Sequence, residues 1–405
     1  MALRGARIIT MKGKEVIENG TIIIRNNRIQ AVGANGKVSI PAGAHVIDVK
    51  GKTIIPGYVD VHWHGGQDGG EHKTELWNYT ATLAFGTTTT RNPQTGSTDV
   101  LSYSDMVETG EMMGPRIYST GPGVFAAEKI ASLNDARDVL KRYSEYYDTK
   151  TLKQYDAGER KVRQWIVMAA NEQKISPTNE GYMDVKKDFT QILDGYAGNE
   201  HSYPIYPLYK DLIQLQAESG NTYTPTLIVN FGAPWGENYF YAGYPIHNDA
   251  KIRRFVPHSV IDQKVMRRTI AFDTTLFNFR QQAEAAAKIV AAGGSVGLGA
   301  HGQFNGPGAH WELWMLQSGG MPRIDALRAA TIVGANSIGL GRDVGSLEVG
   351  KLADLQVLDK NPLDDIHNSI AIKWVMKNGR LFDGNTLDEL WPRQIKRKAM
   401  FTDDQ

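Results

Sequence analysis

The stretch from Ile54 to Gly66, IIPGYVDVHWHGG, is an apolar run that ends in two histidines and two glycines. Because alternate residues of a β-strand face the same side, Asp60, His62 and His64 are expected on one face of a strand. Imidazoles at this spacing can bind one divalent ion or two adjacent ions, with Asp60 as a supporting group. Taken alone, the pattern favours a simpler interpretation, histidines that lie at the surface or cap a buried strand.

The middle of the chain, roughly residues 57–343, alternates β-rich runs with helical patterns. The candidate strands are, in order, TIIPGYVDVH, GTTTTRN, PRIYST, KTLKQY, KISPT, AGNEH, TPTLIV and GSVGLGAH. Between most of them, segments such as ERKVRQWIVMAANEQ place apolar residues three and four apart, as in amphipathic helices. This alternation predicts a parallel sheet, and its length suits an α/β fold of the (β/α)8 TIM-barrel type, typically about 250 residues. No G-x-G-x-x-G follows the first strand, which disfavours a doubly wound open sheet.

Short β-rich segments flank this barrel on both sides. Residues 1–56 contain ALRGARIIT and GTIIIRNNRIQAVG, separated by turn residues, and residues 344–390 contain VGSLEVGKLADLQVLDK and AIKWVMKNGRLFDG. We expect the two segments to form one small β-sandwich. Residues 391–405 are expected to be a solvated C-terminal tail.

The composition limits the kinds of partner and ligand. The 405 residues include 45 basic and 44 acidic side chains, so there is no electrostatic footprint for nucleic acid or an anionic membrane. The chain has no cysteine, so a metal would need His, Asp, Glu or a modified Lys. The start lacks the apolar core of a signal peptide, and no run reaches the roughly 18 apolar residues of a membrane span. We expect a cytoplasmic protein, or a periplasmic or secreted one if a signal segment precedes this sequence.

Two motifs together resemble the amidohydrolase superfamily. They are the P-G-hydrophobic-x-D-x-H-x-H end of the first strand and the G-x-L-x-x-G-K-x-A-D-hydrophobic run from Gly345 to Leu355. The resemblance extends over nearly the whole chain and implies a metal-dependent hydrolase barrel with a β-sandwich built from both termini. Within the superfamily the chain is most similar to Xaa-Pro dipeptidases, imidazolonepropionases and the amidohydrolase part of proteins with a TolB-like β-propeller, although it has no propeller.

The resemblance implies a set of metal ligands. His62 and His64 match the first pair. Lys153 in TLKQY matches the lysine that becomes carboxylated and bridges two metals, and Tyr155 would face the same cavity as a substrate-binding residue. His201 in AGNEH matches a ligand of the second metal.

Two strand ends depart from the family pattern. The fifth strand normally ends in a histidine, but here Thr178 occupies that place, and Glu180 is the better metal ligand by charge and hardness. The eighth strand normally ends in an aspartate that is both ligand and general base, and here His301 stands at that position. A neutral imidazole binds zinc and titrates near neutral pH, so His301 is predicted as ligand or as base.

Two further segments could contribute to a substrate pocket. His310 follows the eighth strand and either lines the pocket or packs at the start of a helix. The long connection after the seventh strand is rich in aromatic residues, including Trp235 and Tyr239. It is interpreted equally well as a lid over an apolar substrate or as an interface between copies of the chain.

The predicted activity is hydrolysis of a C–N amide bond by metal-activated water. The cofactor is expected to be one or two zinc ions, with manganese or iron as alternatives, and Lys153, Glu180 and His301 are the candidate catalytic residues. The substrate is expected to be a small amide, such as an N-acyl amino acid, an Xaa-Pro dipeptide or a cyclic amide, and the chain is expected to form a homo-oligomer. Deamination, ester or lactone hydrolysis, and a catalytically degenerate scaffold remain as alternatives.

Overall fold

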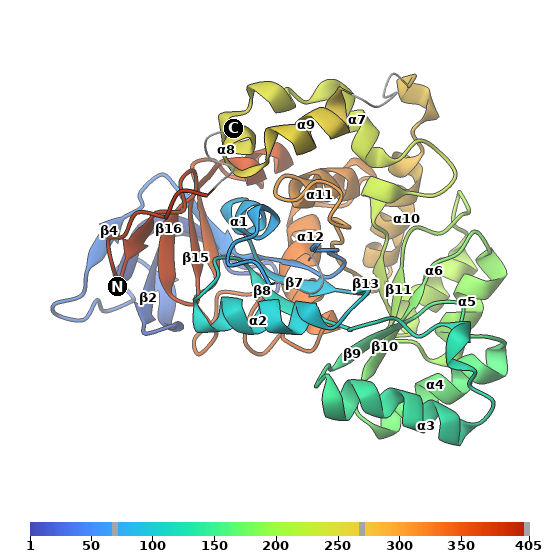
Figure 1. Cartoon of the computed structure of the whole chain (residues 1–405). Coiled ribbons are helices and arrows are strands. Elements are labelled where there is room, and N and C mark those ends of the chain that lie inside the picture. Colours follow the sequence, from blue (N-terminus) through green and yellow to red (C-terminus); the bar gives the residue numbers. More distant parts are fainter. Residues whose placement is uncertain (67–71, 267–271, 401–405) are drawn as a thin grey trace.

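The computed structural model describes residues 1–66, 72–266 and 272–400, and its central part holds two parallel sheets (Figure 1). One has the order β6-β7-β8 and the other the order β13-β12-β11-β10-β9. Their strands are β6 (Tyr58–Asp60), β7 (Thr87–Asn92), β8 (Arg116–Ser119), β9 (Thr151–Gln154), β10 (Ser176–Glu180), β11 (Gly198–Glu200), β12 (Thr222–Thr224) and β13 (Ser295–Val296). The predicted α/β class and parallel strands are therefore confirmed, whereas the strands form two sheets and not one continuous closed barrel.

Backbone contacts link the two sheets at both of their edges. Val61 N–H, just after β6, donates to the carbonyl of Leu298 at 3.0 Å. At the other edge an isolated parallel bridge joins Val124 to Gln154 of β9. The approach beside Val61 requires a glycine, because a Cβ atom on Gly299 would lie 2.7 Å from the Cβ of His62. The first and eighth strand ends are thereby held in contact.

Helices surround the two sheets (Figure 1). An α-helix follows each of the parallel strands β6 to β11: α1 (Trp77–Ala84), α2 (Asp99–Thr109), α3 (Leu133–Lys141), α4 (Arg160–Glu172), α5 (Val185–Asp194) and α6 (Lys210–Glu218). Between β12 and β13 lie α7 (Gly236–Gly243), α8 (Ala250–Phe255), α9 (His258–Val265) and α10 (Phe279–Ala291), and after β13 come α11 (Gly308–Ser318), α12 (Arg323–Arg328) and α13 (Gly334–Ser337). Helices α7, α8 and α9 form the layer at the top of Figure 1.

The seventh strand differs from the prediction. The run TPTLIV was expected to be extended, but β12 ends at Thr224 and Leu227–Val229 is a 3-10 helix, η3. Pro225 has no N–H for a sheet ladder, and Thr226 has a φ of 45°, which turns the chain out of the strand. Glu312 of α11 then accepts the N–H groups of the first two residues of η3, at 2.8 and 2.9 Å.

Both ends of the chain contribute to one nine-stranded sheet, at the left of Figure 1. Its order is β17-β16-β15-β14-β5-β1-β2-β3, with β4 also pairing with β1. The strands are β1 (Ala2–Ile9), β2 (Val16–Arg25), β3 (Arg28–Ala34), β4 (Val46–Asp48), β5 (Thr53–Pro56), β14 (Leu355–Leu358), β15 (Ile372–Lys377), β16 (Arg380–Asp383) and β17 (Glu389–Trp391). Ile54 pairs with Val357, and both belong to an apolar cluster within this sheet.

The two motifs of the sequence meet where this sheet joins the parallel strands. Gly57 donates its N–H to the Asp354 carbonyl at 3.0 Å, and a Cβ atom on Gly57 would collide with Thr88. Asp354 also accepts from Arg116 of β8 at 2.6 Å. Lys351 donates to the Gly341 carbonyl at 2.5 Å. Asp354 of the closing motif therefore connects the terminal sheet to the parallel strands.

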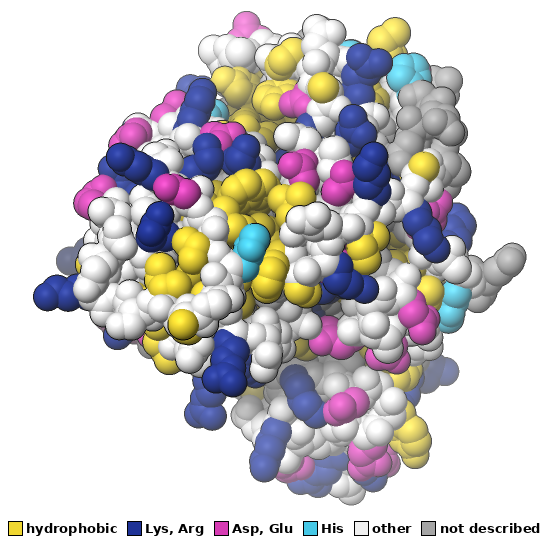
Figure 2. All heavy atoms as spheres, turned by 90° about the vertical axis from the view of Figure 1, so that its left-hand side faces the viewer, with side chains coloured by type: hydrophobic (Ala, Val, Ile, Leu, Met, Phe, Trp, Pro, Cys, Tyr) yellow, Lys and Arg dark blue, Asp and Glu magenta, His cyan; other side chains and the backbone are white. Residues whose placement is uncertain are grey.

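One face of the molecule mixes charged and hydrophobic side chains (Figure 2). On the face drawn in Figure 2, Lys and Arg side chains are interspersed with Asp and Glu, and hydrophobic side chains gather near the middle. In the part of the chain that the structure describes, no helix has the length and apolar character needed to cross a membrane.

Candidate metal centre and active site

The first-strand histidines lie where β6 ends. His62 is fully buried, and Asp60 accepts two backbone N–H groups, from His62 at 3.1 Å and from Ala300 at 3.2 Å. Burial raises the pKa of Asp60 to about 8. Asp60 therefore ties the end of the first strand to the end of the eighth, a supporting position and not a ligand position.

Four imidazoles converge at this point. The His62 ring centroid lies 5.1 Å from that of His64, 4.7 Å from that of His201 and 4.9 Å from that of His301. The His64 and His301 centroids are 4.7 Å apart. These residues come from the ends of β6, β11 and β13, so parallel strands bring their carboxyl ends to one place.

A divalent ion fits the donors of this cluster. One ring nitrogen from each of His62, His64 and His301 lies within 4.8 Å of the other two. Nε2 of His62 is buried and has no hydrogen-bond partner. Burial holds the pKa of His62 and His301 well below the ordinary value, and burial with the nearby Lys153 lowers that of His64 to about 3. Neutral imidazoles are the form that binds zinc.

An ion pair occupies the other half of the site. Nζ of the buried Lys153 lies 2.5 Å from Oε2 of Glu180, and Oε1 of Glu180 lies 3.2 Å from Nε2 of His201. Burial alone would raise the pKa of Glu180, but Lys153 and His201 hold it well below the usual range. The buried Thr178 donates instead to the Leu152 carbonyl at 3.3 Å. Glu180, and not Thr178, is thus the polar group that the fifth strand places in the site.

The sequence interpretation missed the groups that orient these histidines. Oε2 of Glu200 lies 2.7 Å from Nδ1 of His62, and Arg91 pairs with the other Glu200 oxygen. An Nδ1–H donated to Glu200 leaves Nε2 of His62 as the nitrogen with the free lone pair. Nδ1 of His201 lies 2.7 Å from the Thr226 hydroxyl. Glu200 stands in the quoted run AGNEH, so its charge beside a candidate ligand was the available signal.

Two histidines reach the cluster through an unusual backbone conformation. His201 has a φ of 72° and His301 a φ of 60°. Neighbours on a strand face opposite sides, so Glu200 and His201 could not both enter the site from a regular strand. The left-handed turn at His201 re-aims its side chain after β11 ends. This conformation lets the neighbouring Glu200 and His201 side chains both face the histidine cluster.

A cavity of about 400 Å³ opens beside His64. Its lining includes Asn92, the last residue of β7, and Gln94 and Thr95, which follow that strand. The backbone of Gln94 also hydrogen-bonds His64. These polar residues stand in the run RNPQTG, at the end of the predicted strand GTTTTRN and just beyond it, and were not singled out from the sequence. They provide hydrogen-bonding groups beside the histidine cluster.

Tyr155 and His310 have different surroundings. Tyr155 stacks on Phe125 at 4.6 Å, and Nζ of Lys153 lies 4.8 Å from its ring centroid, so the tyrosine lies beside the site. His310 is fully buried, with Nε2 2.9 Å from the Phe85 carbonyl and Nδ1 3.0 Å from the Ser369 hydroxyl. Both of its ring nitrogens are engaged by the protein, so His310 is a core residue and the expectation that it binds substrate is corrected.

Of the aromatic residues that follow the predicted seventh strand, some lie away from the histidine cluster and one contacts it. Tyr239 of α7 packs against Phe240, Phe277 and Phe279, with ring centroids 5.4–5.7 Å away. Trp235, which precedes α7, is 45% exposed, and within the described part of the chain its ring makes no contact with the histidine cluster. Instead the Phe231 ring approaches His201 at 5.6 Å. Of this aromatic segment, Phe231 is the residue that contacts the candidate site.

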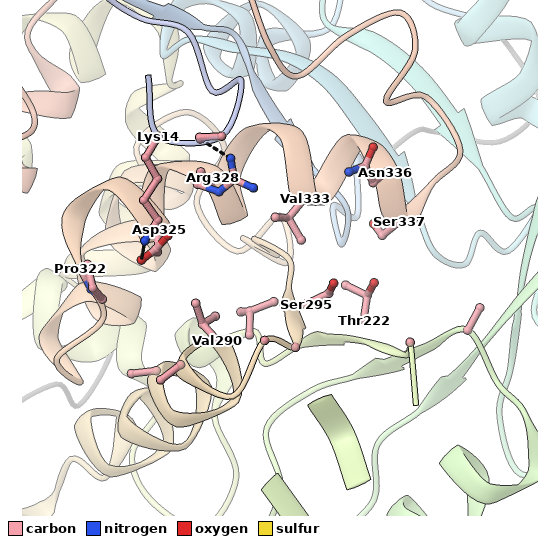
Figure 3. A pocket seen from close by; sticks show the side chains of 18 of the residues that line it. Lys14, Thr222, Val290, Ser295, Pro322, Asp325, Arg328, Val333, Asn336 and Ser337 are labelled. Atoms are coloured by element: carbon pink, nitrogen blue, oxygen red, sulfur yellow. Dashed lines mark hydrogen bonds and ion pairs between the residues drawn. The ribbon is translucent and has the colours of Figure 1, made fainter. Parts of the chain in front are cut away.

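Another cavity, of about 920 Å³, lies at the opposite ends of the strands (Figure 3). Thr222 and Ser295, the first residues of β12 and β13, point into it. Its charged residues are satisfied within the protein, since Lys14 pairs with Asp325 at 2.8 Å and Arg328 donates to backbone carbonyls. Barrel enzymes keep their chemistry at the carboxyl ends of the strands, so the histidine cluster is the candidate active site.

Known proteins resemble this chain in sequence and in fold. The model of the Amidohydrolase family matches residues 190–382. An imidazolonepropionase of Geobacillus sp. (strain WCH70) is 25% identical over 92% of this chain and 92% of its own length. A solved Xaa-Pro dipeptidase with bound methionine has a TM-score of 0.72 and 20% identity, covering 94% of this chain and 99% of that one. Molinate hydrolase has a TM-score of 0.73 and 18% identity, covering 98% of both chains. The chain is thus similar in sequence to the amidohydrolase family over residues 190–382, and similar in fold to solved hydrolases.

Proposed function

We propose that this protein hydrolyses the C–N bond of a small amide with the help of a divalent metal ion, zinc by the chemistry of its ligands. The observation that carries the proposal is the convergence of four imidazoles around the buried, unpartnered Nε2 of His62. The similarity to an imidazolonepropionase and to an Xaa-Pro dipeptidase supports a cyclic amide or an Xaa-Pro dipeptide as substrate, and an N-acyl amino acid belongs to the same chemical class.

The metal would be held by His62, His64 and His301, whose donor atoms lie within 4.8 Å of one another. An ion in this place supplies Lewis acidity for the amide carbonyl and makes a water molecule more acidic. Glu200 fixes the tautomer of His62 through its contact with Nδ1. In this scheme His301 is a ligand, and the proton must be moved by another group.

Glu180 and His201 are placed to move that proton. Their Oε1 and Nε2 atoms are 3.2 Å apart, and Lys153 orients the carboxylate from its other oxygen. We assign this transfer to the His201 imidazole, with the ionised Glu180 as its orienting partner: the imidazole takes the proton of the attacking water and delivers it to the leaving nitrogen as the C–N bond breaks. Asn92 and Gln94, in the cavity beside His64, provide hydrogen bonds for the polar groups of a small amide. Lys153 is therefore a positioning residue in this scheme.

Metal analysis and a substrate panel test the proposal. Chelation should abolish hydrolysis of N-acyl amino acids, Xaa-Pro dipeptides or cyclic amides, and zinc should restore it. The His62→Ala, His64→Ala double variant should remain inactive after zinc loading while keeping the far-ultraviolet circular dichroism of the parent. Esters, lactones and aminopurines in the same panel test the neighbouring activities. Full activity of the metal-free double variant would refute the proposal.

One observation favours a second candidate, a barrel that serves as a binding scaffold. Lys153 and Glu180 already neutralise each other at 2.5 Å without an ion. A protein that retains less than about a tenth of an equivalent of zinc or manganese after loading, and that cleaves no member of the panel, would support the scaffold over the hydrolase.

A further inference from the structure

We propose a second divalent-cation site, outside the candidate active site, formed by His247, His258 and Asp262. The three residues lie in the long connection between β12 and β13. His247 belongs to the 3-10 helix η4 (Ile246–Asn248), which precedes α8, and His258 and Asp262 lie on α9. A cation bound by all three would link η4 to α9 on either side of α8.

The donor atoms already lie close together. One ligand atom from each residue lies within 4.8 Å of the other two, the same spacing that the His62, His64 and His301 group satisfies. His258 and Asp262 are four residues apart on one helix, so they share a face, and their Nδ1 and Oδ2 atoms are 3.3 Å apart. No other group of this kind occurs among the residues that the structure describes.

A buried, unsatisfied nitrogen points to a ligand. Nε2 of His247 is buried and has no hydrogen-bond partner, although the residue as a whole is only partly buried. A buried polar atom without a partner costs free energy that a bound cation would recover. The side chains of His258 and Asp262 are 60% and 32% exposed, so the cation can enter from solvent and keep a water molecule as its fourth ligand.

The donor set selects the class of cation. Two imidazole nitrogens and one carboxylate oxygen suit zinc and similar transition metals, whereas magnesium and calcium prefer oxygen ligands alone. Ligands about 2.0–2.2 Å from a tetrahedral zinc ion lie roughly 3.4 Å from one another. Rotation of the exposed His258 and Asp262 side chains closes the remaining distance. The structure thus assigns this cluster to zinc.

Protection of His258 from diethylpyrocarbonate, located by mass spectrometry, tests the proposal with zinc chloride as the probe. His367 is a matched control, because its side chain is 61% exposed and a carboxylate, Asp365, lies 2.8 Å away, but it belongs to no three-donor group. Zinc should slow the modification of His258 at least tenfold and leave His367 unchanged. The protection should disappear in the His247→Gln and Asp262→Asn variants.

The measurement is repeated in the His62→Ala, His64→Ala variant to separate this site from the active site. We expect His258 to stay protected there, with one equivalent of zinc lost relative to the parent and a second lost on adding His258→Gln. Equal modification of His258 with and without saturating zinc would overturn the proposal. So would protection that survives both His247→Gln and Asp262→Asn, or protection of His367 at the same zinc concentration. None of these results depends on the hydrolytic activity.

Discussion

The charge of the candidate active site depends on Lys153 and Glu180. Their contact at 2.5 Å places an ammonium beside a carboxylate, and the lysine is almost completely buried. A carboxylated Lys153, which the family resemblance implies, would put two negative groups at this distance unless a cation lay between them. The modification of Lys153 stays a prediction, and the sign of its interaction with Glu180 distinguishes the two forms.

A double-mutant cycle measures that sign. With an unmodified lysine, Glu180→Gln should lower the free energy of unfolding by about 2 kcal/mol, because it leaves a buried ammonium without its partner. Lys153→Met in the same chain should recover most of the loss. Urea unfolding of the metal-free parent, both single variants and the double variant checks this. A stabilising Glu180→Gln substitution would indicate the carboxylated form, and additivity within about 0.5 kcal/mol would show no coupling.

Glu200 provides a second test at the level of one residue. Its carboxylate contacts Nδ1 of His62 at 2.7 Å, so Glu200→Gln removes the charge that orients this ligand. We expect zinc affinity to fall about 10- to 100-fold, as for other groups that support metal-binding histidines. Competition with a chromophoric chelator measures the change. A change of less than about twofold would mean that Glu200 has only a packing role, and Glu172→Gln on the surface is the control.

At the scale of elements, the 3-10 helix η3 shows how a neighbouring helix shapes the site. Glu312 of α11 accepts the N–H groups of Leu227 and Ile228. The preceding Thr226 lies 2.7 Å from Nδ1 of His201. The end of the seventh strand, and with it the support of His201, therefore depends on a carboxyl group that comes much later in the chain.

Glu312 also predicts a pH dependence. Burial raises its pKa to about 8 in the folded chain, above the ordinary value of 4.5, so the folded state binds more protons between these values. Its contribution to stability is therefore present below about pH 4.5 and is lost as the pH rises towards 8, by at most roughly 1.4 kcal/mol per pH unit. Urea unfolding at pH 5, 6, 7 and 8 should show a shallower decline for Glu312→Gln than for the parent. Parallel curves would contradict this assignment.

At the scale of the whole molecule, Asp354 couples the terminal sheet to the parallel strands. It accepts from Arg116 of β8 at 2.6 Å and from the backbone N–H of Asn378 at 2.7 Å. Both charged side chains of this ion pair are buried. The nine-stranded sheet assembled from both ends of the chain is thus joined to the parallel sheet whose first strand, β6, leads to His62 and His64.

Removing this charge should destabilise both parts together. We expect Asp354→Asn to lower the free energy of unfolding by about 3 kcal/mol, because the Arg116 guanidinium stays buried without its partner. Glu172→Gln breaks an exposed pair with Arg137 and should cost less than about 1 kcal/mol. Calorimetry and urea unfolding measure both variants. A loss for Asp354→Asn no larger than that of the control would show that the pair does not couple the two parts.

Local patterns were sufficient for much of the fold. The alternation of β-rich and helical runs predicted parallel strands, and the motifs around Gly57 and Asp354 predicted that both ends of the chain belong to one β-rich unit. Such patterns work because each element must bury its own apolar face. The strand prediction was wrong for Leu227–Val229, where proline chemistry and a distant carboxylate outweigh β propensity. For His310 the sequence left pocket lining and helix packing open, and its partners Phe85 and Ser369 decide for packing.

By itself, the sequence determined the order of the elements, the strand end that carries His62 and His64, and the resemblance to the amidohydrolase family. Only the tertiary structure decided the contacts within the site. Glu200 contacts His62, Glu180 pairs with Lys153, and left-handed turns direct His201 and His301 towards the cluster. The reason is physical. Periodicity and motifs report how a residue relates to its neighbours in the chain, whereas protonation, ion pairing and metal binding depend on atoms that folding brings within about 3 Å from strands far apart in sequence.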